Sequence, residues 1–410
     1  MNKLTATPAR IDRWKGVVLA ILSLAAVGLL FAFFFSSPDA ATLAKHASEA
    51  FMDRRFGEAE ADLAQLRRLR APTAFDWMME GQLAIYKGKT DEALTALAKV
   101  PDDYPMAAQA RLEAGQLELR RSRYVAAEKL LLEAIKLDPK SVQARRELVY
   151  IYGMQLRRPE INANFRELAR ISTLTYSEVF LWCLSRGVSW EVNEVIATLK
   201  KCLEADPNDS WARLGIAEGL RELRRFDEAD SILAPLPDSD PRARATRVRL
   251  ALDRGDDQAA ETLLAAGPSD DVDLTLLRGR FALARGDGPE AVRQFRIAHE
   301  EAPSLREAVI GLGQSLQSIG DSAAAAPLLE EARKHERLGT LIVKASALKN
   351  RDDPALMRDL GEACAALGRF TEARTWYNLA ITRDPFDIQA QDGIQRVKEL
   401  EARAQSPGPK

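Results

Sequence analysis

The stretch that decides the fold is Tyr104–Pro139, which reads YPMAAQARLEAGQLELRRSRYVAAEKLLLEAIKLDP. Apolar and small residues recur at helical spacing in two runs, 107–119 and 125–137, separated by the polar sequence RRSR at 120–123. Pro139 ends the second run, because proline lacks an N–H group and disfavours helical geometry at the preceding residue. The stretch therefore predicts a helical hairpin.

Small residues hold fixed positions in this hairpin. Gly115 lies twelve residues before Ala127, and Ala134 follows two helical turns later. Small side chains are needed where two helices approach closely, because a bulky Cβ substituent would force the helix axes apart. The same spacing recurs at Gly81–Ala93, Gly279–Ala291, Gly313–Ala325 and Gly361–Ala373.

A period of about 34 residues with this pattern is the signature of the tetratricopeptide repeat. The chain resembles that family over nearly everything after its first forty residues. The resemblance implies an all-α fold in which about ten helical hairpins stack as a right-handed superhelix over 39–385. The period lengthens to 48 residues between Ala325 and Ala373, which predicts an extra helix near 339–350. A polar helix at 386–404 is expected to cap the array, and 405–410 to form a disordered tail.

Glycine marks the turn between the two helices of five hairpins, at Gly88, Gly255, Gly286, Gly320 and Gly368. We expect each glycine to supply the left-handed residue that ends the first helix. An Asp or Thr soon after it is expected to cap the second helix. The acidic residues of these turns therefore have a backbone role and do not indicate a metal site.

An uncharged run precedes the repeats. Residues 17–35 read VVLAILSLAAVGLLFAFFF. A helix of this length spans about 28 Å, close to the ~30 Å hydrocarbon core of a bilayer. We interpret 17–36 as an uncleaved transmembrane helix; the alternative is a cleaved signal peptide, whose apolar region is usually shorter.

The charges beside this run predict its orientation. The short tail at 1–16 carries four Lys or Arg residues and a single acidic one. The positive-inside rule therefore places the N-terminus in the cytoplasm and the repeats on the non-cytoplasmic side of a single-pass protein. In a bacterium with two membranes, that side is the periplasm.

The sequence lacks the motifs of common catalytic sites. The three histidines, His46, His299 and His335, lie in separate repeats, and no GxSxG, HExxH or phosphate-loop sequence is present. The net charge of −2 gives no overall attraction for nucleic acid. We expect no enzymatic activity, no cofactor, no metal site and no nucleic-acid partner.

Two of the three cysteines fall in one predicted hairpin. Cys183 and Cys202 take small-residue positions where its helices would come closest. Two interpretations are open: a disulfide in an oxidising compartment, or two buried thiols that pack as small apolar residues. Cys364 is interpreted as a packing residue.

The resemblance implies that the first helix of each repeat lines a concave groove, which binds an extended peptide or a helix of a partner. The residues that map to this surface are Phe75, Met78, Gln82, Tyr86, Gln116, Arg120, Arg145, Leu148, Tyr152, Trp211, Leu214 and Glu218. Aromatic and Arg side chains among polar ones are typical of interface hot spots. The alternative for each aromatic residue is packing between adjacent repeats.

These observations favour a membrane-anchored scaffold that binds protein partners on the non-cytoplasmic side, with a role in envelope assembly or secretion. The second interpretation is a periplasmic chaperone-like adaptor that holds unfolded clients. A repeat-containing transferase ranks last. The pattern indicates neither the partner nor the oligomeric state.

Overall fold

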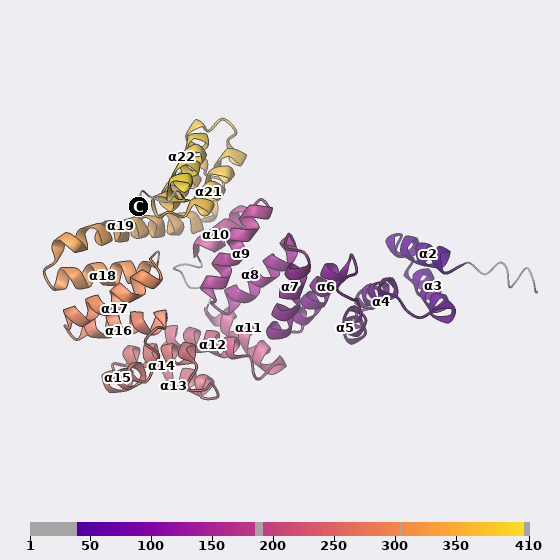
Figure 1. The fold of residues 1–410 in the computed structure, drawn as a ribbon, viewed down its shortest axis with the longest axis horizontal. Coiled ribbons are helices and arrows are strands. Elements are labelled where there is room, and N and C mark those ends of the chain that lie inside the picture. Colours follow the sequence, from indigo (N-terminus) through magenta and orange to yellow (C-terminus); the bar gives the residue numbers. More distant parts are fainter. Residues whose placement is uncertain (1–38, 185–191, 304, 406–410) are drawn as a thin grey trace, which may run out of the picture. The chain divides into compact units, whose positions relative to one another are not determined.

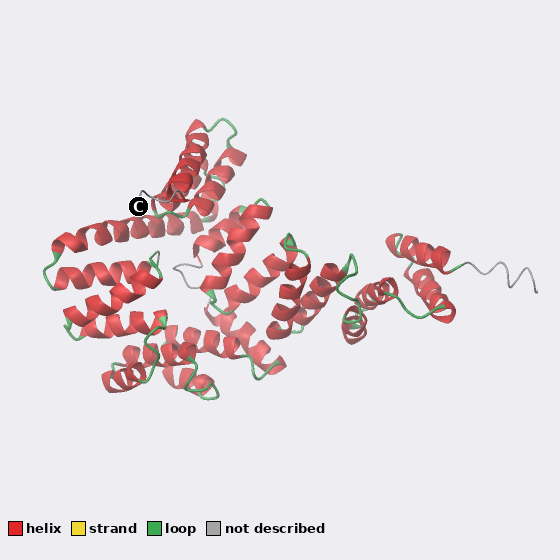
Figure 2. Cartoon of the chain, in the orientation of Figure 1, coloured by secondary structure: helices red, strands yellow, loops and turns green. Residues whose placement is uncertain are grey.

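The computed structural model describes residues 39–184, 192–303 and 305–405 (Figure 1). These residues form 21 α-helices and one 3₁₀ helix, and none of them lies in a strand (Figure 2). The predicted all-α class is confirmed. The tail at 1–16, the membrane helix expected at 17–36 and residues 406–410 lie outside the described residues. Across the residues that are described, no helix is both long and apolar enough to span a bilayer.

The chain divides into two compact units, Met1–Ala110 and Arg111–Lys410. In the first unit the described helices are α2 (Ala40–Met52), α3 (Phe56–Leu69), α4 (Ala74–Tyr86), α5 (Thr90–Leu97) and the start of α6 (Ala107–Arg120). One apolar core joins α2, α3 and α4, around Leu43, Leu63, Leu66, Met79 and Leu83.

The second unit holds the remaining helices. They are α7 (Tyr124–Leu137), α8 (Val142–Met154), α9 (Arg158–Ile171), α10 (Tyr176–Leu184), α11 (Val192–Ala205), α12 (Ser210–Glu222), α13 (Phe226–Leu233), α14 (Pro241–Arg254), α15 (Asp257–Ala265), α16 (Val272–Ala284), α17 (Gly288–Glu301), α18 (Arg306–Ser318), α19 (Ser322–Ser346), η1 (Leu348–Asn350), α20 (Pro354–Ala366), α21 (Phe370–Arg383) and α22 (Ile388–Gln405). The helices α2 to α21 form ten consecutive pairs, as predicted, and α22 follows the last pair.

The extra helix predicted near 339–350 is not a separate element. α19 continues without a break through Gly339 to Ser346, and η1 takes only Leu348–Asn350. The second helices of two neighbouring repeats, α17 and α21, end just before Pro303 and Pro385. No proline stands between 328 and 353, so the helix is not stopped at the usual place.

Each of the nine turns within pairs that the structure describes contains one residue in the left-handed region. Five are the predicted glycines, with φ between 68° and 87°. The other four are Arg54, Ser122, Leu156 and Arg224, with φ between 56° and 61°. The next residue donates its N–H to a carbonyl five residues earlier, as Lys89 does to Ala84 at 2.8 Å. The hairpin geometry therefore imposes this conformation even where no glycine lowers its cost.

Glycines inside the helices make room for large side chains of neighbouring helices. A Cβ on Gly279 would lie 3.0 Å from the ring of Phe295, and one on Gly311 would lie 2.3 Å from the same ring. A Cβ on Gly361 would lie 2.9 Å from the ring of Tyr377, and one on Gly393 would lie 2.5 Å from it. The predicted close approach at the Gly positions is therefore confirmed.

Three second helices are short, and arginines compensate for the early ends of two of them. α5 and α13 have eight residues each and α15 has nine. Arg247 donates to the carbonyls of Leu233 and Leu236 at 3.0 and 2.8 Å. Arg278 likewise donates to the carbonyls of Leu264 and Gly267, at 2.9 and 2.8 Å. The last carbonyls of a helix have no partner within the helix, and these side chains supply one.

Candidate functional site

The first unit contains a cleft of about 600 Å³ between α3, α4 and α5. It is lined by Glu60, Leu63, Ala64, Arg67, Trp77, Glu80, Leu83, Ala84, Lys87, Lys89, Asp91, Glu92, Thr95, Ala96 and Lys99. Leu63, Leu83 and Ala96 are buried and form an apolar base. The long side chains around this base are charged.

The start of α4 fixes one wall of the cleft. Asp76, buried in the first turn, accepts a bond from the backbone N–H of Thr73 at 2.7 Å and is paired with Arg70. Burial alone would raise the pKa of Asp76, but the bonds from Arg70 and Thr73 hold that pKa below its usual value. The carboxylate therefore stays charged at the positive end of the helix and holds the first turn in place.

Trp77 is the aromatic side chain of the cleft. It follows Asp76 directly and is half-buried. The Lys99 ammonium lies 4.0 Å from the centre of its ring and the Arg67 guanidinium lies 5.9 Å away. Cation–π attraction stabilises these contacts. The indole therefore forms a fixed apolar surface between charged groups.

The charges around the cleft balance. Arg67, Lys87, Lys89 and Lys99 face Glu60, Glu80, Asp91 and Glu92. Three ion pairs join members of the two sets: Arg67–Glu80, Lys87–Glu60 at 2.6 Å and Lys89–Glu92 at 2.9 Å. The cleft has neither the basic excess that phosphate backbones need nor a purely apolar lining.

The four residues predicted in α4 do not line this cleft. Met78 is 2% exposed, so its side chain belongs to the core and is not available to a partner. Phe75 packs against the core of the first unit, and Gln82 is half-buried. Tyr86 is exposed and stacks on Phe56, with 3.7 Å between the ring centres. Trp77 was not predicted, because the repeat pattern does not distinguish a tryptophan beside a cleft from one in a core.

In the second unit, Gln116 and Arg145 form hydrogen bonds to other residues of the chain. Gln116 donates to Glu147 at 3.0 Å. Arg145 donates to the carbonyl of Pro139, six residues earlier, at 3.2 Å. Arg213 and Arg244 make the equivalent bond in later repeats, which indicates that an arginine at this position fixes the loop before the first helix. Arg120 is exposed at the end of α6.

Tyr152 and Trp211 belong to a cluster around Arg157 rather than to an open groove. Arg157 is 8% exposed and pairs with Glu128 at 2.7 Å and with Glu160 at 3.0 Å. Its guanidinium lies 4.3 Å from the ring centre of Tyr152 and 4.4 Å from that of Trp211. The prediction that Tyr152 is a surface residue is wrong: it is 3% exposed, and its hydroxyl bonds Glu128 at 3.0 Å.

The electrostatics of this cluster depend on its ion pairs. Burial would lower the pKa of Arg157, but bonding to Glu128 reverses this effect and raises the pKa. Burial raises the pKa of Tyr152, and the negative charge of Glu128 adds to the rise. Arg157 therefore remains a cation and Tyr152 a neutral donor.

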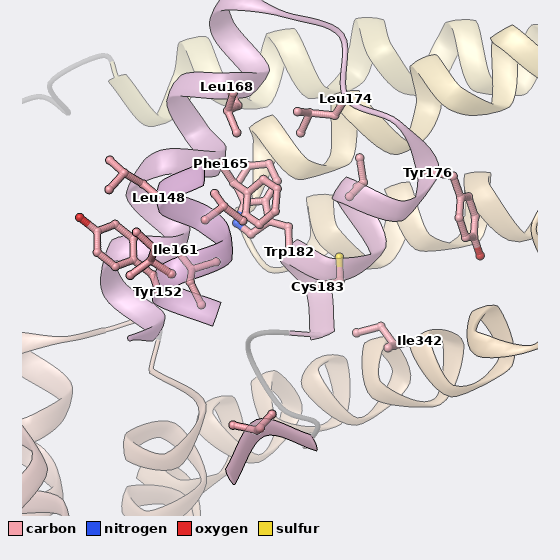
Figure 3. Close-up of a cluster of buried hydrophobic side chains, with 14 of the residues drawn as sticks. Leu148, Tyr152, Ile161, Phe165, Leu168, Leu174, Tyr176, Trp182, Cys183 and Ile342 are labelled. Atoms are coloured by element: carbon pink, nitrogen blue, oxygen red, sulfur yellow. The ribbon is translucent and has the colours of Figure 1, made fainter. Parts of the chain in front are cut away.

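Three further predicted residues, Leu148, Leu214 and Glu218, also make contacts within the protein. Leu148 is fully buried (Figure 3) and Leu214 is 5% exposed. Glu218 accepts from Arg221 at 2.8 Å, from Arg249 at 2.9 Å and from Thr246 at 3.0 Å. Burial opposes the charge of Glu218, but the two arginines hold its pKa below the usual value. Glu218 therefore joins α12 to α14.

The cysteines lie in two different surroundings, and all three thiols are free. The Trp376 indole N–H donates to Cys183 Sγ at 3.3 Å. Cys202 donates to the carbonyl of Thr198 at 3.4 Å. Burial raises the pKa of Cys202 to about 12. A Cys183–Cys202 disulfide stays a prediction, which counting free thiols under denaturing, non-reducing conditions would check.

Among the described residues, no three His, Cys, Asp or Glu side chains are arranged to hold a metal ion. His46 bonds Asp62 at 2.6 Å, and His335 is buried in α19.

Among the solved structures, several resemble this chain at low identity. A tetratricopeptide repeat protein from Parabacteroides merdae is 16% identical with a TM-score of 0.31, over 59% of this chain and 98% of that one. Yeast Tom70 is 10% identical with a TM-score of 0.32, and the match covers 89% of this chain and 96% of Tom70. Human IFIT1 with m7Gppp-AAAA is 13% identical with a TM-score of 0.36, and the match covers 90% of this chain and 82% of IFIT1. These identities and scores are too low to carry an argument about function.

None of the curated proteins matches the chain. Models of the tetratricopeptide repeat match residues 78–142, 191–248 and 310–388, which together make up just under half of the chain. The matched segments fall in both compact units and overlap helices of both. The chain thus contains tetratricopeptide repeats within an all-α array of helical hairpins.

Proposed function

We propose that this chain is a protein-interaction scaffold that is anchored in a membrane by residues 17–36 and binds its partner on the non-cytoplasmic side. Tetratricopeptide repeats support the role of a scaffold, and the apolar run with its basic flank supports the anchor. The observation that carries the proposal is the cleft at Trp77, whose size and mixed lining suit a peptide segment.

The chemistry of the cleft favours a protein partner over a nucleic acid. Its four cations are matched by four carboxylates, and three of the cations are in ion pairs. Binding to a phosphate backbone requires an excess of Lys and Arg, because each phosphate contact needs a cation. An extended peptide that places an apolar or aromatic side chain on Trp77 and polar groups beside it would satisfy both parts of the lining.

Site-specific crosslinking in the intact membrane tests the cleft. We expect a photoreactive residue at Thr95, which is exposed and lines the cleft, to capture one dominant partner in a fixed stoichiometry. The same residue at Glu49, which is exposed on α2 and does not line the cleft, is the matched control. Trp77→Ala should reduce capture from Thr95 about tenfold or more, since the loss of a central aromatic anchor typically costs at least 2 kcal/mol of binding.

Two outcomes would overturn this assignment. Equal capture from Thr95 and Glu49 would show that the cleft is not the binding surface. A broad set of unrelated clients, each unaffected by Trp77→Ala, would favour the chaperone-like adaptor.

The proposed membrane anchor is tested by extraction of the membrane. The full chain should stay with the membrane after an alkaline wash, whereas Leu24→Arg combined with Val27→Arg should release it, because each arginine at the centre of a membrane helix costs about 2.5–3.5 kcal/mol. Leu24→Ile combined with Val27→Leu is the control and should remain bound. Release of the unmodified chain would contradict the anchor.

A further inference from the structure

Lys99 is the one cation of the cleft that has no carboxylate partner among the described residues. The other three cations form ion pairs inside the cleft: Arg67 with Glu80, Lys87 with Glu60 and Lys89 with Glu92. The fourth carboxylate of the lining, Asp91, takes part in another interaction within the chain. The positive charge of Lys99 is therefore left for a partner to neutralise.

The ammonium group of Lys99 also covers part of the Trp77 ring. It lies 4.0 Å from the centre of the indole, on an exposed side chain that follows the end of α5. Trp77 is half-buried, so a partner side chain and this ammonium compete for the exposed part of one ring. Lys99 must therefore turn away before a partner can pack fully on Trp77.

A carboxylate can move Lys99 away from the ring. At an exposed site, the attraction between an ammonium and an aromatic ring is weaker than a hydrogen bond between two charged groups. The flexible four-carbon stem of lysine lets the ammonium turn from the ring to a carboxylate beside it. A carboxylate next to the apolar side chain of a partner would thus neutralise Lys99 and uncover Trp77 at the same time.

We propose that Lys99 selects a partner segment in which an acidic residue, Asp or Glu, stands directly beside an apolar one. This proposal rests on the function proposed above, since it names the chemistry of the segment that the cleft binds. One free cation suits the single charge of a carboxylate, whereas a phosphorylated side chain carries nearly two charges and would keep one unpaired. A basic segment would repel Lys99 and leave it over the ring.

Peptide probes test this chemistry on the full chain in detergent. Three synthetic peptides differ only in the residue after a phenylalanine, which is glutamate, glutamine or lysine. A photoreactive residue at Thr95 captures the peptide that occupies the cleft. We expect the glutamate peptide to be captured at least about fivefold more than the glutamine peptide, and the lysine peptide least. The preference should weaken as sodium chloride is raised.

Substitutions of Lys99 separate its charge from its packing. Lys99→Glu should reverse the preference, so that the lysine peptide is captured best, and Lys99→Met should abolish the difference between glutamate and glutamine. Lys99→Arg keeps the charge and should retain about half of the capture or more. Lys45→Glu, the matched control, makes the same change of charge at an exposed lysine of α2 outside the cleft and should leave the preference unchanged.

The partner captured from Thr95 in the intact membrane provides a second test. Mass spectrometry of the crosslink identifies its bound segment, which should contain an acidic residue beside an apolar one. Replacing that acidic residue by lysine should reduce capture by the unmodified chain about tenfold, and the Lys99→Glu variant should restore it. Such a rescue requires the two charges to meet, and a merely structural role of Lys99 would not produce it.

Two results would overturn the proposal: equal capture of the three peptides, or a preference for glutamate that persists in Lys99→Glu. Both differ from failure of the cleft as the binding surface, which equal capture of the partner from Thr95 and Glu49 would reveal. A partner whose capture depends on Trp77 but not on Lys99 would leave the scaffold role intact and remove the selection of an acidic segment.

Discussion

Trp376→Ala is expected to lower the free energy of unfolding of the second unit by about 3–5 kcal/mol, the usual cost of removing a large buried aromatic side chain. Trp376 is completely buried and touches both Tyr176 and Cys183 of α10. Its removal leaves a cavity between α10 and α21 and takes away the donor to Cys183.

Hydrogen exchange of the full chain, read segment by segment, measures this effect. We expect exchange to accelerate in α20 and α21 and also in α10, which is distant in sequence but in contact with α21. Phe386→Ala is the control, since Phe386 is 90% exposed near the same end of the chain and should change stability by less than about 0.5 kcal/mol. Acceleration confined to α20–α22 would show that the contact between α10 and α21 contributes nothing to the stability of α10.

Arg157→Met is the second large expected effect, with a loss of about 3–5 kcal/mol in the stability of the second unit. The substitution leaves Glu128, which is largely buried, without its cation and removes the stacking on Tyr152 and Trp211. An unpaired carboxylate in such surroundings costs more than the lost packing, because its charge is no longer compensated.

A neighbouring residue and a double substitution separate these contributions. Arg158→Met alters an exposed arginine one position along the chain and should change stability by about 0.5 kcal/mol or less in urea unfolding. Glu128→Gln combined with Arg157→Met should recover part of the loss, since it removes the uncompensated charge. Equal effects of Arg157→Met and Arg158→Met would contradict a structural role for the buried ion pairs.

The periodic pattern predicted the local structure well. The runs at 107–119 and 125–137 became α6 and α7 with nearly the same bounds, and the five turn glycines took the left-handed conformation. These features depend on neighbours in the sequence: apolar spacing sets the buried face, proline stops a helix, and glycine lowers the cost of the turn. α19 departs from the prediction for the same local reason, since no proline stands between 328 and 353 to end it.

Residue roles on the helix surfaces were predicted less well. Tyr152, Trp211 and Glu218 resemble partner-binding residues by type and register, yet each is engaged by charged side chains from other helices. Trp77 was not predicted, although it lines the cleft. Whether an aromatic side chain on a helix is exposed depends on the length of the adjacent helix and on the cations that cover it, and neither is encoded in the repeat spacing.

The sequence by itself determined that this chain forms helical hairpins of the tetratricopeptide type, where its five glycine turns lie, and which small residues lie at the helix crossings. Only the tertiary structure decided that α21 returns to α10 and that Arg157 is enclosed by two carboxylates and two aromatic rings. The reason is physical: hairpins form through contacts over a few tens of residues, whereas the contact between α10 and α21 joins segments far apart in the chain. Small differences in how successive repeats pack accumulate along the array and fix which distant surfaces meet.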